Sequence, residues 1–198
     1  MGLPEKKRHY TYADYATWDD DKRWELIDGE PYAMAAPDAN HQRISGNLCR
    51  HLANFLYGKP CEVFSAPFDV MLNAGDVDDS DVVQPDIVVI CDRSKIIKKG
   101  CNGAPDMVIE ILSPSTANHD KIKKFNKYLH VGVREYWIVD PRYKDVQVFI
   151  LENGRYFATV YAPATEGENE EESGNDTIPV HVLEGCTINL QDIFKNVE

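Results

Sequence analysis

The stretch that decides the fold runs from Pro85 to Pro141. It reads PDIVVI at residues 85–90, GAPDMVIEILSPST at 103–116 and HDKIKKFNKYLHVGVREYWIVDP at 119–141. Asp86 and Glu110 each stand in a short run of Val, Ile and Leu, and such runs predict buried strands. A carboxylate in a buried strand is costly unless a partner satisfies it. The stretch therefore predicts two strand carboxylates that act together at one site.

The composition is that of a globular protein. The chain has 198 residues, of which 43% are hydrophobic and 10% aromatic, and this predicts a single domain over residues 1–198 with a sizeable core. The sequence shows neither an apolar run of 18 residues nor an apolar N-terminal segment, so we expect no membrane span and no secretory signal. Its five cysteines form an odd set without a close pair, which predicts free thiols in a reducing cytoplasm. They are Cys49, Cys61, Cys91, Cys101 and Cys186.

The charge of the chain is unevenly distributed. The net charge of −12 argues against a simple nucleic-acid binder, which usually carries a basic face. Ten of the negative charges lie in two segments without Lys or Arg, residues 73–82 and 165–176. We expect both to be solvated acidic loops. The rest of the chain is nearly neutral, so DNA remains a candidate partner.

The pattern along the chain predicts helices interspersed with strands. Residues 24–35 are typical of a hairpin that turns at Asp28-Gly29. Helical spacing of apolar residues predicts helices at 41–57 and 119–131, the second with a buried face of Ile122, Phe125 and Leu129. Strands are expected at 87–90, 107–112, 135–139, 146–151 and 155–161. The elements together predict an α/β or α+β domain with a mixed sheet.

Two positions within these elements have structural interpretations. Tyr136 and Trp137 alternate on a strand, so we expect one in the core and the other on the surface. Asp106 belongs to a second Pro-Asp pair, at a strand entrance, where a turn role is the better interpretation.

Asp86 and Glu110 suit a metal site. Phosphodiester hydrolysis needs an activated water and neutralised charge, which Mg²⁺ supplies when one or two carboxylates hold it near the phosphate. The connection at residues 91–105 would let the two strands pair and bring the acids together. The backbone carbonyl of Ile111 would add a third oxygen ligand. Mg²⁺ is the expected cofactor, and Mn²⁺ is an alternative.

A lysine next to Glu110 must come from another element than the strand that carries this carboxylate. Glu110 and Leu112 share a face of their strand, so a lysine at position 112 would lie next to the carboxylate, but Leu stands there. The following helix offers Lys124, one turn after Asp120 and one turn before Tyr128. We predict Lys124 as the site lysine. Asp120 either joins the site or caps the helix, and Tyr128 either packs or hydrogen-bonds to a site carboxylate.

The motifs together resemble the Uma-type family of restriction endonuclease-like proteins, in the PD-(D/E)XK nuclease superfamily. The resemblance spans about residues 12–194. It rests on PDIVVI, EILSPST, the spacing of Asp120, Lys124 and Tyr128, GVREYWIVDP, ELIDGE at 25–30 and HQRISGNL at 41–48. It implies a restriction endonuclease-like central mixed β-sheet flanked by helices, with additional β-hairpins. It also implies a metal site built from Asp86 and Glu110, with Lys124 in place of the usual E-x-K lysine.

Two further residues have open interpretations. Glu25 matches the family's N-terminal glutamate, which in many of these nucleases lies near the metal; alternatively, it pairs with Lys22 or Arg23 at a hairpin edge. His41, at the start of its helix, either lies near the site or caps and solvates the helix.

The resulting functional prediction is a Mg²⁺-dependent endonuclease that hydrolyses DNA through Asp86, Glu110 and Lys124. A homodimer is expected by analogy, because cutting two strands needs two sites. The alternative is a catalytically silent nuclease-fold module with an interaction or regulatory role, motivated by the acidic surface and the missing E-x-K lysine. A weaker alternative is a hydrolase of a small phosphorylated molecule.

Overall fold

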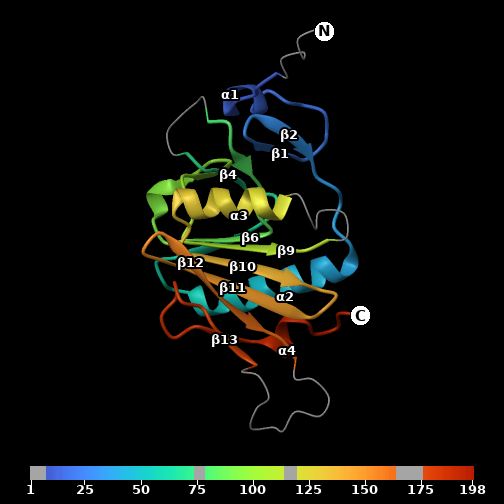
Figure 1. Ribbon diagram of the computed structural model, residues 1–198, viewed down its shortest axis with the longest axis vertical. Helices are drawn as coiled ribbons and strands as arrows, with labels where there is room; N and C mark the ends of the chain where they lie inside the picture. The colour runs from blue at the N-terminus through green and yellow to red at the C-terminus, as the bar shows by residue number, and fades with distance from the viewer. Residues whose placement is uncertain (1–7, 74–78, 114–119, 164–175) are drawn as a thin grey trace.

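A central six-stranded sheet organises the computed structural model, which describes residues 8–73, 79–113, 120–163 and 176–198 (Figure 1). The central sheet has the strand order β12-β11-β10-β9-β6-β3, a second six-stranded sheet has the order β2-β1-β5-β4-β8-β7, and β13 pairs with β14. The helices are α1 (Tyr12–Tyr15), α2 (Ala39–Leu56), α3 (Asp120–Val131) and α4 (Leu190–Ile193), with a 3-10 turn at Arg93–Lys95. The strands are β1 (Trp24–Ile27), β2 (Glu30–Ala33), β3 (Glu62–Ser65), β4 (Asp69–Met71), β5 (Val82–Val83), β6 (Ile87–Ile90), β7 (Ile96–Ile97), β8 (Gly100–Asn102), β9 (Met107–Ile111), β10 (Glu135–Asp140), β11 (Asp145–Glu152), β12 (Arg155–Tyr161), β13 (Thr177–Pro179) and β14 (Thr187–Asn189).

The predicted mixed sheet flanked by helices is confirmed. In the central sheet β9 and β10 run parallel, whereas β6 is antiparallel to β9 and β11 is antiparallel to β10. Helices α2 and α3 cover opposite faces of this sheet (Figure 1). The predicted apolar stripe of α2 packs on one face through Ile44, Leu48, Leu52 and Leu56.

The expectation for β10 is wrong, because helices cover both faces of the central sheet. Tyr136 and Trp137 are both buried, at 1% and 0% exposure, rather than one in the core and one on the surface. Trp137 packs in the core beneath α2, and Tyr136 packs in the core beneath α3. A strand that is covered on both sides buries both of its alternating sets of side chains.

The buried face of α3 also differs from the expected one. Phe125 packs against the rings of Phe149 and Tyr156, but Ile122 is 68% exposed. The helix ends at Gly132 as predicted, and this residue has a φ of +83°, which favours glycine. The predicted turn at Asp28-Gly29 is likewise present between β1 and β2.

The first acidic segment is not wholly solvated, contrary to expectation. Asp79 and Asp81 are buried. Asp79 accepts hydrogen bonds from the backbone and side chain of Asn73, and Asp81 accepts from the backbone N–H of Asp28 and from Lys127 Nζ. The bond from Lys127 to Asp81, directly before β5, joins α3 to the second sheet. Residues 74–78 and 164–175, on which the rest of the prediction falls, lie outside the described residues.

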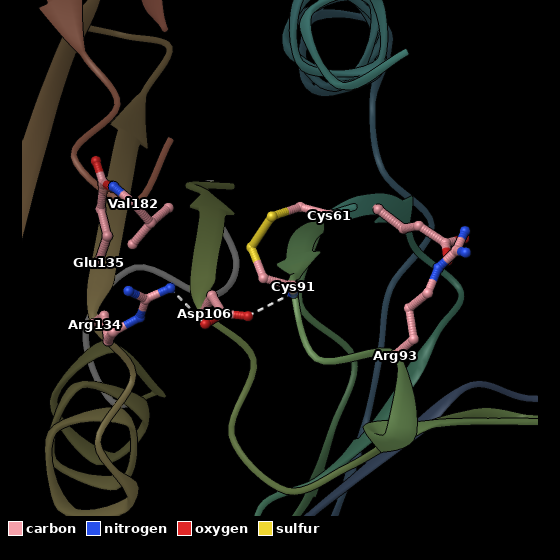
Figure 2. The surroundings of a disulfide bond; sticks show 8 residues. Cys61, Cys91, Arg93, Asp106, Arg134, Glu135 and Val182 are labelled. Atoms are coloured by element: carbon pink, nitrogen blue, oxygen red, sulfur yellow. Dashed lines mark hydrogen bonds and ion pairs between the residues drawn. A yellow bond between two sulfur atoms is a disulfide. The ribbon is translucent and has the colours of Figure 1, made fainter. Parts of the chain in front are cut away.

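The prediction of five free cysteines is wrong, because Cys61 and Cys91 form a disulfide (Figure 2). Cys61 directly precedes β3 and Cys91 directly follows β6, and Glu62 lies opposite Ile90 in this antiparallel pair. Strand register therefore brings together two cysteines that lie 30 residues apart in the sequence. The disulfide removes the basis for expecting a reducing compartment. In the described residues, no helix has both the length and the apolar character needed to cross a membrane.

Candidate active site

Asp86 and Glu110 come together at one end of the central sheet. Asp86 directly precedes β6, and Glu110 lies near the end of β9. Because β6 and β9 are antiparallel, with Ile87 opposite Ile109, the start of one strand lies beside the end of the other. The backbone N–H of Ile111 donates to Asp86 Oδ2 at 2.7 Å. The structure thus places the two predicted carboxylates side by side.

A cavity of about 360 Å³ opens at this end of the sheet. Both carboxylates line it, and their side chains are each 15% exposed. The segment at residues 33–38, which joins β2 to α2, forms part of its wall. The charged residues that line it are Arg23, Glu25, Asp38, His41, Asp86, Glu110 and Lys124. A substrate that entered the cavity would meet both carboxylates.

Lys124 lies between two carboxylates. Its Nζ is 3.1 Å from Glu110 Oε1 and 2.6 Å from Glu25 Oε1. The hydroxyl of Tyr128, one turn further along α3, donates to Glu110 Oε1 at 2.7 Å. The lysine is buried, and a buried cation needs such charged partners. Helix α3 therefore brings a lysine to Glu110, in place of the lysine that is missing at Leu112 directly after β9.

Glu25 reaches this cluster from the second sheet. It lies on β1, is buried, and accepts a hydrogen bond from the backbone N–H of Gln84 at 2.8 Å. Its ion-pair partner is Lys124, whereas the alternative interpretation paired it with Lys22 or Arg23. The N-terminal glutamate of the resemblance thus lies in the same cluster as Glu110.

His41 lies in the wall of the site. Its Nε2 is 3.2 Å from Asp86 Oδ2. The cap of α2 is Asp38, whose carboxylate accepts from the backbone N–H of His41 at 2.8 Å. The backbone of Asp120 begins α3, but its side chain lies outside the described residues.

Burial and charge shift the ionisation of the site groups. Burial raises the pKa of Glu110 to about 7, with help from Asp86 and Glu25, while Lys124 and Tyr128 oppose the shift. Burial alone would lower the pKa of Lys124, but the charges of Glu110 and Glu25 raise it overall. Burial also acts to lower the pKa of His41, but the hydrogen bond and charge of Asp86 raise it. Lys124 is therefore a cation at neutral pH, and Glu110 titrates near neutrality.

The donor set is compatible with Mg²⁺. The described contacts of the two carboxylates use one oxygen of each, Asp86 Oδ2 and Glu110 Oε1. The N–H of Ile111 faces Asp86, and its carbonyl points to the same side of the strand. Among the described residues, no group of three or more His, Cys, Asp and Glu is arranged to hold a metal. An ion would therefore rely on two carboxylates, this carbonyl and water, as Mg²⁺ commonly does.

Two residues of the site were missed from the sequence. Gln84 is buried just before Pro85-Asp86, and its side-chain Oε1 accepts from Arg23 Nε at 2.9 Å. Arg23 was considered only as a partner of Glu25. A polar residue between Val83 and the Pro-Asp pair was the available signal for Gln84. The contact with Arg23 depends on tertiary structure across 61 residues.

A mixed sheet flanked by helices, with two strand carboxylates and a buried helical lysine at one end, defines a restriction-endonuclease-like class of fold and site. The chain belongs to the Uma2 family, described as "Putative restriction endonuclease", whose model matches residues 12–191. The predicted family is thereby confirmed.

The chain is also similar to two proteins of Synechocystis sp. and, in fold, to one solved structure. The uncharacterized protein slr1290 of Synechocystis sp. is 29% identical over 139 residues, covering 69% of this chain and 71% of that protein. The uncharacterized protein sll1609 of the same organism is 29% identical over 119 residues, covering 59% and 65%. The crystal structure of "a putative nuclease belonging to DUF820" from Anabaena variabilis matches the fold with a TM-score of 0.70. That match is 20% identical in sequence and covers 93% of this chain and 97% of the other. Family and fold together indicate a restriction-endonuclease-like nuclease.

Proposed function

We propose that this protein is a Mg²⁺-dependent endonuclease that hydrolyses phosphodiester bonds in DNA, and that Mn²⁺ can replace Mg²⁺. The observation that carries the proposal is the meeting of Asp86 and Glu110 in one cavity, with Lys124 against Glu110. Two carboxylates and an adjacent ammonium suit the combination of a divalent cation and a phosphate.

The proposed metal ligands are Asp86, Glu110 and the carbonyl of Ile111. When bound, the ion would neutralise phosphate charge and lower the pKa of a water molecule. His41 and the N–H of Ile111 hold Asp86 in position, and Tyr128 holds Glu110. These contacts fix the direction of both carboxylates before substrate arrives.

Lys124 is proposed to act on the substrate side of this pair. An ammonium group has three N–H donors, and the described contacts of Lys124 are with Glu25 and Glu110. The remaining donor is available for the attacking water or for a phosphate oxygen in the cavity. Because both carboxylates favour its charged form, we expect Lys124 to serve as a hydrogen-bond donor and electrostatic stabiliser rather than as a base.

The direct test is nicking of supercoiled plasmid DNA. We expect the parent chain to nick in Mg²⁺ or Mn²⁺, to stop when a chelator is added, and to lose the activity in Asp86→Ala. Asp92→Ala is the matched control, because Asp92 is an exposed carboxylate that caps the 3-10 turn outside the cavity. Equal nicking by Asp86→Ala and the parent would overturn the proposal.

A catalytically silent module is the competing function, and Leu112 is the observation that favours it. Leu112 is buried in the core at the position of the missing E-x-K lysine. Calorimetry separates the two proposals. Mg²⁺ binding that disappears in Glu110→Gln supports the nuclease, whereas no binding at millimolar Mg²⁺ supports the silent module.

We further propose that the nuclease works as a homodimer on double-stranded DNA, because one site cuts one strand. Sedimentation velocity of the full chain with and without a DNA duplex tests this. A species of one chain per duplex that still cuts both strands at once would contradict it.

A further inference from the structure

Arg23 is a cation of the cavity that the proposed metal site does not use. It directly precedes β1 and lines the same cavity as Asp86 and Glu110. Within the described part of the chain it makes no ion pair, and its Nη2 is buried without a hydrogen-bond partner. A buried N–H group without an acceptor costs free energy. Arg23 is thus suited to receive an acceptor that enters the cavity.

The guanidinium group is held in place by a neutral partner. Arg23 Nε donates to Gln84 Oε1 at 2.9 Å. Gln84 is itself fixed, because its Nε2 donates to Asp69 Oδ1 at 2.8 Å and to the Tyr15 hydroxyl at 3.1 Å. Its backbone N–H donates to Glu25 Oε1. The contact orients the guanidinium without neutralising its charge.

Arg23 differs in this respect from the other basic side chains of the cavity. Lys124 contacts two carboxylates, and His41 contacts Asp86. An arginine that is oriented but not paired with a carboxylate matches the needs of an anion, because its planar fork of N–H donors fits two phosphate oxygens. A positive charge that no carboxylate neutralises also favours the binding of an anion in a chain whose net charge is −12.

We propose that Arg23 binds a phosphate of the nucleic-acid backbone in the cavity, next to the Asp86 and Glu110 pair. The assignment of the phosphate to DNA rests on the proposed function; the assignment of a phosphate group rests on Arg23 and Gln84 alone. In this arrangement Arg23 sets the position of the nucleic-acid strand, and the two carboxylates with their ion act on that nucleic-acid strand.

The first experiment measures binding without cleavage. Fluorescence anisotropy would follow a labelled DNA duplex in Ca²⁺ instead of Mg²⁺, with the full chain, over a series of salt concentrations. We expect Arg23→Gln to weaken binding about tenfold, because hydrogen bonds to charged groups are strong. The slope of log affinity against log salt should fall by about 0.9, the value for one lost phosphate contact on duplex DNA. A merely structural role would not change that slope.

Two variants keep the result interpretable. Lys22→Gln removes the neighbouring positive charge, which is exposed and outside the cavity, and we expect a smaller effect on affinity than in Arg23→Gln. Arg23→Lys keeps the charge but loses the fork, so it should keep the salt slope and bind several-fold more weakly than the parent. If Arg23→Gln does not fold, as judged by its melting temperature, Arg23→Lys decides the matter: unchanged affinity in that variant would overturn the proposal.

Binding of inorganic phosphate separates this proposal from the nuclease. Phosphate binding that is lost in Arg23→Gln, measured by calorimetry, supports the inference even in a chain that never nicks plasmid DNA. Conversely, a chain that nicks DNA with the same KM and the same salt slope in Arg23→Gln retains the nuclease function and overturns the role of Arg23. Mn²⁺ binding should be equal in Arg23→Gln and the parent, because both carboxylates remain.

Discussion

The two Pro-Asp pairs of this chain lie at opposite ends of the same pair of strands. Asp86 directly precedes β6, and Asp106 directly precedes β9. Each aspartate accepts a hydrogen bond from the backbone N–H of a residue at the end of the other strand. Ile111 N–H donates to Asp86 at 2.7 Å, and Cys91 N–H donates to Asp106 at 2.6 Å. Each aspartate also has a basic partner, His41 for Asp86 and Arg134 for Asp106. As elements of local structure, the two pairs are nearly equivalent.

Their surroundings differ. Asp86 lies beside Glu110 in a cavity, with Lys124 and Glu25 behind the glutamate. Asp106 lies beside the disulfide of Cys91 and pairs with Arg134, whose side chain is 55% exposed (Figure 2). A Pro-Asp pair by itself therefore indicates only the start of a strand. The candidate active site is distinguished by a second carboxylate, Glu110, with its partner Lys124.

The largest expected difference between the two ends is in catalysis. We expect Asp86→Asn to lower kcat for plasmid nicking by about 10³-fold, because it removes a charge that the proposed ion requires. Asp106→Asn should keep kcat within about twofold and lose about 1 kcal/mol of unfolding free energy. Nicking kinetics and urea unfolding of both variants measure this contrast. A large loss of kcat in Asp106→Asn as well would remove the distinction between the two ends.

Lys124 should matter for stability as much as for activity. Its removal in Lys124→Met leaves Glu25 and Glu110 as buried carboxylates without their cation, so we expect a loss of about 4 kcal/mol in unfolding free energy. Lys123→Met is the matched control, because the contacts of Lys123 within the described residues are with the hydroxyl and ring of Tyr32 rather than with a buried carboxylate, and its effect should stay below about 1 kcal/mol. Chemical denaturation without added metal gives both values. Equal stability of the two variants would show that Lys124 is not the partner of these carboxylates.

Removal of the disulfide should lower the stability of the fold and leave the candidate active site unchanged. Closing a loop of 30 residues stabilises the folded chain by roughly 3.6 kcal/mol in the chain-entropy description. We expect Cys61→Ser with Cys91→Ser to lower the unfolding free energy by up to that amount and to keep the nicking rate. Unfolding curves with and without a dithiol reductant provide an independent measurement. A fall in nicking that exceeds the fraction of unfolded chain would mean that the two ends are coupled.

The carboxylate of Glu110 should give the metal-free chain a distinctive pH dependence. The folded chain holds the Glu110 proton up to a pKa of about 7, whereas the ordinary pKa of a solvent-exposed glutamate is 4.5, so between these values the folded state binds more protons than the unfolded state. Stability from this group is therefore complete below pH 4.5 and is lost as the pH rises through 7. The loss should be on the order of 2 kcal/mol. In Glu110→Gln this part of the pH profile should be absent, and an unchanged profile would contradict the assignment.

Local patterns were enough to predict much of the fold and the members of the site. The short apolar runs around Asp86 and Glu110 predicted the two strands, and helical spacing placed Lys124 and Tyr128 on one face of α3. What the sequence could not supply was tertiary arrangement. The pairing of Cys61 with Cys91 depends on the register of β3 against β6, and the burial of both Tyr136 and Trp137 depends on helices that cover both sides of the sheet.

The same limit explains the errors around the site. Arg23 meets Gln84 only because β1 and the segment before β6 are brought together by the second sheet. Asp81 is buried because Lys127 and the backbone of Asp28 reach it from distant parts of the chain. A run of acidic residues alone indicates solvent, and only the three-dimensional arrangement shows which members have partners.

The proposed metal site is best tested with a crystal of the full chain soaked with Mn²⁺ and measured at the manganese absorption edge. The proposed metal site predicts one anomalous peak between Asp86 and Glu110, with ligand oxygens at about 2.1 Å, the distance typical of an octahedral site for an ion of this kind. The peak should be absent from crystals of Asp86→Asn. An empty cavity in the parent crystal, or a peak that survives in Asp86→Asn, would show that these two carboxylates do not hold the ion.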